Sequence, residues 1–393
     1  MDTIGAAGAG PGPIDRTAGD RTAGRTADHA GGAPARGRTA WPDAVRVGLT
    51  ALVVAHHCAV TYSHIPVWTY TEYPRPDDTS AGLLDLFLGL NQAWFMGAFF
   101  LVSGWFVPGS VDRHGVAGFV RGRLLRLGVP FLAFAVVLRP IFYLPAWKPG
   151  DGNALLWAMA RPDPGPLWFV LVLLAFSLVY AGIRLLRSPA PVVPGRAPGL
   201  LAVGGFGLLI GVASWLWWTV APLGTFWPGL PSVWLLPQYA LCFAAGIAGG
   251  RRDWFTRLRG RTGVGAAVLA LLTGPGWLAV LTAGGDAATG RGTATSALVA
   301  VLGGLFAASI TTAVLVGARR CCNRSGPVAR FLSSNAYAVY VLHAPIVAWL
   351  GVALAGVAAS ALGKAALLFA CSVVACWGAA WAVRRVPVVR RVL

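Results

Sequence analysis

Long apolar stretches alternate with short polar segments along most of this chain. A helix needs about 20 apolar residues to cross the hydrocarbon core of a bilayer. Ten such stretches follow one another, and each predicts a transmembrane helix. Their approximate limits are 44–62, 85–107, 125–146, 166–186, 199–219, 231–250, 263–284, 295–317, 335–354 and 361–383. The pattern therefore predicts an all-α polytopic membrane protein with about ten spans.

The N-terminal residues 1–40 lack this pattern and consist mainly of Gly, Ala, Thr, Arg and Asp. Such a segment buries too little apolar surface to offset its ordering entropy, so we expect a disordered cytoplasmic tail. It holds no apolar core of the signal-peptide type, so the first apolar stretch is expected to be retained. The expected organisation is this tail, a membrane domain over 41–386, and a short basic cytoplasmic tail over 387–393.

Composition agrees with a membrane protein and excludes several other classes. Of the 393 residues, 56% are hydrophobic and 12% are charged, whereas soluble domains carry about 25% charged residues. An ordinary cytosolic enzyme and a disordered chain are thereby excluded. The six cysteines form no CxxC pair, so the sequence predicts neither a disulfide framework nor a metal site. The bias toward Arg, Gly and Pro is typical of proteins encoded by GC-rich bacterial genomes.

The net charge of +18 reflects membrane topology rather than nucleic-acid binding. If the N-terminus is cytoplasmic, most of the 32 basic residues fall in the inner segments. By the positive-inside rule, both termini then lie in the cytoplasm. No loop is long enough to form a basic nucleic-acid-binding domain. The basic residues of the outer segments are Arg75, Lys148, Arg161, Arg291 and Lys364.

The first span carries Arg46 and His57, and titratable groups inside a span are functional candidates because they are costly there. Eleven helical steps end about 20° beyond three full turns, so both residues share one face, about 16 Å apart. A ligand that contacts both must be long and must enter from the inside. The alternative for Arg46 alone is an anchor at the membrane surface. His56 points toward a different neighbour, which favours a structural role.

The second span offers Gln92, at about the same depth as His57. Its amide can orient the imidazole or hold a substrate carbonyl, but inter-helix hydrogen bonding by Asn91 and Gln92 is an equally good interpretation. No span interior carries a clear acid. A carboxylate partner for His57 should therefore come from the first outer region, and Asp85 is the preferred candidate.

Two further groups of polar residues belong to later segments. Arg123 and Arg126 share a helical face in an inner loop, where two guanidiniums bind either lipid headgroups or a phosphorylated ligand. Tyr337, Tyr340 and His343 recur at every third position of the ninth span. His343 is expected near mid-membrane, either bonded to a neighbouring helix or supporting catalysis.

These motifs, in this order, resemble the acyltransferase 3 family of bacterial integral-membrane acyltransferases. The strongest match is Arg46-x10-His57. The others are Trp94 to Gly104, Arg121 to Pro130 with its Arg-x-x-Arg, Leu167-Trp168-Phe169, and the run Ser334 to His343. Within the family, Ser103 to Pro108 and Leu167 to Tyr180 look most like the glucan biosynthesis protein C branch. The resemblance makes these residues candidates for substrate binding: Trp94, Ser103, Trp168, Tyr337 and Tyr340.

The resemblance implies an acyl-CoA-dependent acyltransferase, one that transfers groups other than aminoacyl groups, in the bacterial plasma membrane. Acyl-CoA would be a cosubstrate rather than a bound cofactor, and no metal or nucleic acid is implied. Its nucleotide end would meet Arg123, Arg126 and Arg46, while the thioester reaches His57. His57 would act as a base toward an acceptor hydroxyl or carry the acyl group transiently. The acceptor would be a carbohydrate or another cell-envelope or secondary-metabolite hydroxyl.

Two other classes of function remain compatible with ten spans. A secondary transporter fits the topology, although the two halves show no convincing internal repeat and the spans offer no clear buried acid for ion coupling. A structural or regulatory membrane protein is the third interpretation, and the shared face of Arg46 and His57 argues against it.

Overall fold

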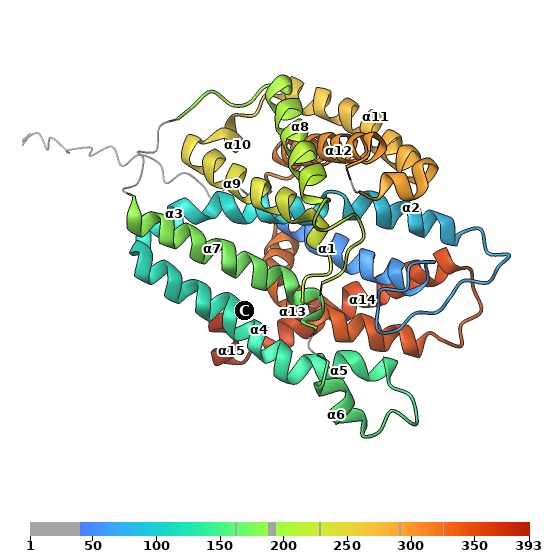
Figure 1. Ribbon diagram of the computed structural model, residues 1–393. Helices are drawn as coiled ribbons and strands as arrows, with labels where there is room; N and C mark the ends of the chain where they lie inside the picture. The colour runs from blue at the N-terminus through green and yellow to red at the C-terminus, as the bar shows by residue number, and fades with distance from the viewer. Residues whose placement is uncertain (1–39, 162, 188–193, 228, 291, 325) are drawn as a thin grey trace, which may run out of the picture. The chain divides into compact units, whose positions relative to one another are not determined.

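A computed structural model describes residues 40–161, 163–187, 194–227, 229–290, 292–324 and 326–393. The predicted tail therefore lies outside the described residues except for Ala40. The described part is built of helices and loops, without a named β-strand (Figure 1). The long helices are α1 (Trp41–Thr61), α2 (Ala81–Gln92), α3 (Phe95–Arg123), α7 (Trp168–Leu186), α8 (Leu200–Trp217), α9 (Leu236–Arg252), α11 (Gly260–Gly284), α12 (Ala294–Cys321), α13 (Pro327–Ala353) and α14 (Ala361–Val383).

Shorter helical segments connect them. The region after α3 combines π-helical and α-helical turns, and most of the other short segments are single turns at the ends of spans. They are η1 (Leu124–Gly128), α4 (Val129–Ala133), η2 (Phe134–Leu138), α5 (Arg139–Tyr143), η3 (Leu144–Ala146), α6 (Ala154–Met159), η4 (Gly165–Leu167), η5 (Val233–Leu235), α10 (Trp254–Arg257), η6 (Gly285–Ala288) and α15 (Pro387–Val392). The expected C-terminal tail is thus largely helical.

Nine helical stretches of the described chain are long and apolar enough to cross a membrane, which confirms the all-α polytopic class. One of them, Ala81–Ala146, contains both predicted spans 85–107 and 125–146. Its 66 residues would measure about 100 Å as one straight helix, three times a bilayer core. The chain turns at Gly115 (φ 67°, ψ 173°), a conformation that L-residues avoid. The two predicted spans therefore lie on opposite sides of this turn.

The helices pack in three groups (Figure 1). The first group is α1, α13 and α14, the second is α3, α7 and α9, and the third is α8, α11 and α12. In the second group α3 and α9 approach closely through glycines. A Cβ atom on Gly104 would lie 2.3 Å from the Phe243 carbonyl oxygen, and one on Gly246 would lie 2.1 Å from that of Leu101. Small residues allow such contact between membrane helices.

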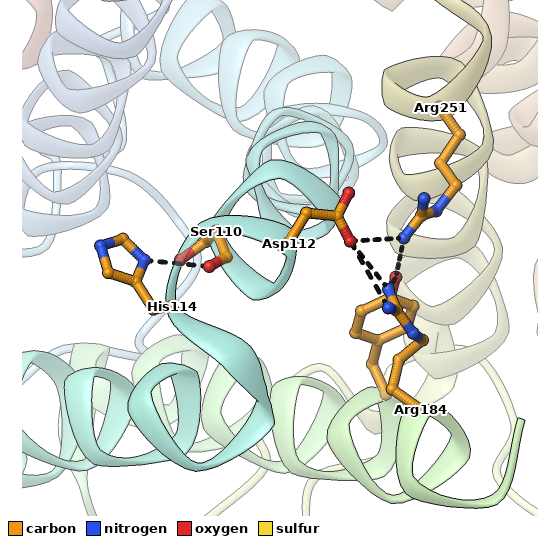
Figure 2. Close-up of polar contacts among 6 residues, drawn as sticks. Ser110, Asp112, His114, Arg184 and Arg251 are labelled. Atoms are coloured by element: carbon orange, nitrogen blue, oxygen red, sulfur yellow. Dashed lines mark hydrogen bonds and ion pairs between the residues drawn. The ribbon is translucent and has the colours of Figure 1, made fainter. Parts of the chain in front are cut away.

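The second group is tied at one end by a charged cluster. Asp112 of α3 faces Arg184 of α7 and Arg251 of α9, as Figure 2 shows. Its Oδ1 atom lies 3.3 Å from Arg184 Nη1 and 3.2 Å from Arg251 Nη2. The Tyr180 hydroxyl accepts a hydrogen bond from each guanidinium. Three segments predicted on the inner side of the membrane therefore meet, although which side faces the cytoplasm stays a prediction.

The α2–α3 boundary breaks a predicted continuous span at Ala93 and Trp94. Trp94 has φ −139° and ψ −35°, which is not helical. Backbone groups freed inside a membrane protein need new partners. The buried amide of Gln238 supplies one, because its Nε2 atom donates to the Ala93 carbonyl at 2.9 Å. Gln92 before the break and Phe95 and Met96 after it line a small cavity.

Candidate active site

Two histidines from the first and thirteenth helices lie in direct contact. Nε2 of His343 is 3.1 Å from Nδ1 of His57, and the ring centroids are 5.0 Å apart. His343 is fully buried. Each residue lies equally far from the first residue of its helix, so parallel packing of α1 and α13 brings the two rings to one level. His343 thus lies at the level of His57, and its depth in the membrane stays a prediction.

The hydrogen-bond partners of the two rings assign a tautomer to each neutral imidazole of this pair. His343 Nδ1 lies 2.6 Å from the carbonyl oxygen of Tyr340, which can only accept, so Nδ1 must carry a hydrogen. In the neutral ring, Nε2 is then an acceptor. His57 Nδ1 must therefore donate to it, which leaves Nε2 of His57 without a hydrogen. An imidazole nitrogen in this state is ready to accept a proton from a substrate.

His56 makes a separate set of contacts beside this pair. Its Nδ1 atom lies 3.3 Å from the amide Nδ2 of Asn91, which is buried. Its ring stacks on Phe95 at 5.2 Å and meets the His57 ring edge-on at 5.6 Å, with an interplanar angle of 87°. Asn91 therefore forms a hydrogen bond between α2 and α1. Hydrogen bonding between helices was one of the two interpretations that the sequence left open. His56 lies beside His57 rather than away from the site.

A cavity of about 50 Å³ is lined by His56 and His57. Its wall combines apolar side chains from α1 and the start of α3 with a few polar groups. The Gln92 amide belongs to it and donates to the Ser232 hydroxyl at 2.9 Å. This mixture of apolar wall and convergent polar groups is typical of small-molecule sites. The lining residues are Val53, His56, His57, Gln92, Phe95, Met96, Pro166, Trp168, Ser232 and Tyr340.

Trp68, in the loop between α1 and α2, packs against His57. Its ring stacks on the His57 imidazole with centroids 4.2 Å apart and planes 23° apart. Phe142 packs against the far edge of the same indole. The contact of Trp68 with His57 joins segments whose proximity no local sequence pattern indicates.

The loop that carries Trp68 is fastened to α14. Lys364 Nζ lies 2.6 Å and 2.7 Å from the two carboxylate oxygens of Glu72, and it also reaches the Ala355 carbonyl. Asp78 accepts hydrogen bonds from Ser80 and from the backbone N–H of Ala361, and these bonds lower its pKa. Trp68 therefore lies on a loop held at more than one point.

The preferred acid, Asp85, is not the partner of His57. Its carboxylate binds His64, with Oδ2 2.6 Å from the ring Nδ1 and Oδ1 accepting from the backbone N–H at 3.1 Å. His64 lies just beyond the end of α1, where the chain turns back toward α2. Depth along the span was a poor guide because the loop places another histidine nearer to the carboxylate. The contact expected from Asp85 is made by His343.

The arginine candidates lie away from the cavity. Arg46 contacts Asp43 one turn earlier in α1, at 3.3 Å, and lies about 16 Å along the helix from His57. Arg126 is exposed, and its backbone carbonyl accepts a 2.5 Å hydrogen bond from Tyr337. Arg123 lies over the Phe119 ring at 5.1 Å. Tyr337 and His343 are on one helix, so α13 connects the two arginines with the histidine pair.

The remaining candidates divide into two sets. Trp168 and Tyr340 line the cavity, and the Tyr340 hydroxyl donates to the Pro166 carbonyl. Trp94 is buried in the apolar core and Ser103 is half-buried on α3, and neither lines the cavity. A larger apolar groove of about 600 Å³ lies between α3 and α7, away from the histidines. Within the described ranges, no three His, Cys, Asp or Glu residues are grouped to hold a metal ion.

The sequence model of the acyltransferase 3 family, described as an acyltransferase domain, matches residues 39–381. The chain belongs to the acyltransferase 3 family. It is thus a membrane acyltransferase, as the order of the motifs predicted. Comparison with curated proteins and with solved structures finds no match. The glucan biosynthesis protein C branch stays a prediction for this acyltransferase, because the match identifies the family as a whole.

Sequence reasoning did not single out several residues around the histidines. Among them, Trp68 stacks on His57 from a loop, while Ser232 and Phe95 line the cavity from the approach to η5 and from the start of α3. Each reaches the site through tertiary packing. A local signal for this region was present in the adjacent pair His56 and His57. Two neighbouring histidines inside a span are costly, so they suggest a functional site.

Proposed function

We propose that this acyltransferase moves an acyl group from cytoplasmic acyl-CoA to a hydroxyl of a carbohydrate or another cell-envelope acceptor, in the bacterial plasma membrane. The observation that carries the proposal is the hydrogen-bond chain from the Tyr340 carbonyl through His343 to His57. It assigns the hydrogen of His57 to Nδ1, so Nε2 can accept a proton, and His57 lines the cavity.

The reaction follows from this arrangement. The acceptor hydroxyl oxygen attacks the thioester carbonyl carbon, while His57 Nε2 takes the hydroxyl proton. The C–S bond then breaks, and the proton passes from His57 to the departing thiolate. The products are the O-acyl ester and free coenzyme A. Of the two roles considered for His57, we take the base, with Nδ1 held by His343 and Nε2 as the proton acceptor.

The surroundings support both substrates. The cavity of about 50 Å³ suits a short acyl group, and its apolar wall includes Val53, Phe95 and Met96. The row Tyr337, Tyr340 and His343 leads along α13 from the Arg126 segment to the imidazoles. Acyl-CoA is elongated enough to have its phosphates near Arg123 and Arg126 with its thioester at His57. Arg46 would meet the donor near the start of α1.

The test uses inside-out membrane vesicles from native cells that carry or lack the gene, supplied with radiolabelled acetyl-CoA. Vesicles with the gene should release free thiol and gain alkali-labile label in their glycans or lipids. His57→Ala should reduce both by at least about 100-fold, the usual contribution of a general base. His114→Ala is the matched control, since His114 is exposed and bonds the Ser110 carbonyl (Figure 2).

Full activity in His57→Ala, with protein present in the membrane, would refute the base. No thiol release by the wild type, together with accumulation of a small solute in cells without the gene, would instead favour the transporter.

A further inference from the structure

We propose that His56 is a second catalytic residue, which donates a hydrogen bond from its Nε2–H to the acyl carbonyl oxygen as that oxygen becomes negative. This inference deepens the proposed function and rests on it. It concerns a residue whose phase on α1 suggested a structural role. His56 lines the same cavity as His57 and is held there by Phe95 and Asn91.

The tautomer of His56 follows from Asn91. The amide nitrogen Nδ2 of Asn91 can only donate, and it lies 3.3 Å from His56 Nδ1. Nδ1 must then accept, so the neutral ring carries its hydrogen on Nε2. Asn91 is buried at the last turn of α2, immediately before the break in the span, so its position is fixed by the backbone.

The two neighbouring histidines therefore hold opposite tautomers. His57 has a bare Nε2 because Nδ1 donates to His343, and His56 has a hydrogen on Nε2 because Nδ1 accepts from Asn91. One cavity wall thus offers both a proton acceptor and a hydrogen-bond donor. The rings are nearly perpendicular at 5.6 Å, so His56 can meet the carbonyl oxygen while His57 meets the attacking hydroxyl group.

These two states match the needs of acyl transfer. When the acceptor oxygen bonds to the thioester carbon, the C=O pair of electrons moves to the carbonyl oxygen, and the hydroxyl proton moves to His57. The oxyanion is stabilised by a fixed donor that is already in place. As the C=O bond reforms and the C–S bond breaks, the proton leaves His57 for sulfur. His56 gains and loses no proton in this sequence.

The experiment measures thiol release and ester formation from acetyl-CoA in the vesicles described above. His56→Phe keeps an aromatic ring against Phe95 but has no donor. We expect kcat to fall about 100-fold, as for loss of one oxyanion donor, with KM for acetyl-CoA changed less than about twofold. His56→Gln places an amide N–H near the former Nε2 position and should restore about a tenth of the wild-type kcat. His64→Phe is the control outside the cavity.

A second probe separates a direct contact from a structural role. In acetyl-dithio-CoA, sulfur replaces the carbonyl oxygen and accepts hydrogen bonds poorly. The wild type should prefer acetyl-CoA over this analogue much more strongly than His56→Phe does, because the variant has already lost the contact. If His56→Phe does not accumulate in the membrane, Asn91→Leu gives the same test, since it removes the donor that fixes the tautomer. Asn91→Leu should lower kcat and weaken the preference for acetyl-CoA over acetyl-dithio-CoA.

Wild-type kcat in His56→Phe, or an unchanged preference between the two thioesters, would overturn the role of His56. If His57→Ala is inactive in the same vesicles, the proposed function stands and only the His56 inference fails. A wild-type protein that transfers no acetyl group would overturn both.

Discussion

His343 accepts a hydrogen bond at Nε2 from Nδ1 of His57, across two helices that are far apart in the sequence. The bond joins α1 to α13 and assigns the hydrogen of His57 to Nδ1. We therefore expect His343 to position His57 without contacting the substrate.

The first prediction concerns His343→Phe, which keeps a ring in the buried site but removes the acceptor. The proton of His57 is then free to occupy either nitrogen, so kcat should fall by about 10- to 100-fold with little change in KM. The double variant with His57→Ala should be no slower than His57→Ala alone, because residues that act as a unit are not additive. Independent, multiplicative effects in the vesicle assay would contradict the pairing.

The second prediction concerns the donor. Arg126→Ala should raise KM for acetyl-CoA by several-fold and leave kcat nearly unchanged, because a guanidinium far from the cavity contributes to binding but not to the transition state. Arg324→Ala serves as the control, since it changes another exposed arginine that lies outside this segment. Equal KM values for Arg126→Ala and the wild type would remove Arg126 from the donor site.

The histidine pair could be anticipated in part, and its environment could not. Hydropathy located the spans within a few residues, and helical phase placed Tyr340 and His343 on one face. The break at Ala93 and Trp94 was missed because apolar residues continue on both sides of it, while the Ala93 carbonyl that it frees is bound by Gln238 from another helix. The opposite tautomers of His56 and His57 depend on Asn91 and His343, contacts that no single span encodes.

The third prediction tests the cover over His57. Trp68→Ala should expose the imidazole and speed its modification by diethylpyrocarbonate, whereas Trp68→Phe should keep most of the protection because a ring can still stack. The site of modification is read by mass spectrometry of the peptide that carries His57. Trp147→Ala is the control, since its indole bonds within its own loop. The same modification rate in Trp68→Ala and the wild type would mean that the indole does not shield His57.

The fourth prediction concerns the ion pair that fastens the loop. The Lys364 side chain is 4% exposed and that of Glu72 is 34% exposed. Glu72→Gln leaves a buried ammonium without its counter-charge, at a cost on the order of 3 kcal/mol. Lys364→Met leaves a half-exposed carboxylate, which water can solvate, so it should lower the melting temperature less. Thermal unfolding in detergent measures the melting temperature of both variants. A larger decrease for Lys364→Met than for Glu72→Gln would contradict the view that the lysine depends more on the ion pair.

The double variant Glu72→Gln with Lys364→Met supplies the matched control for that comparison. It removes both charges, so its melting temperature should lie above that of Glu72→Gln alone.

The fifth prediction concerns the contact between α3 and α9. Gly246→Ala should destabilise the fold strongly, because the new Cβ atom would lie 2.1 Å from the Leu101 carbonyl oxygen and the two helices must separate. Gly182→Ala on α7 has open space around the new methyl group and should be neutral or slightly stabilising. Folded yield and melting temperature in detergent report both. Equal stability of the two variants would show that α3 and α9 are not in close contact.

The packing of the helices in groups has a consequence for access to the cavity. His56 and His57 come from the group that contains α1 and α13, while Phe95, Met96 and Trp168 come from the group of α3, α7 and α9, which the Asp112 cluster ties together. The cavity thus lies at a seam between two groups of helices. We expect a small change in the spacing of the two groups to alter the width of the cavity without unwinding any helix.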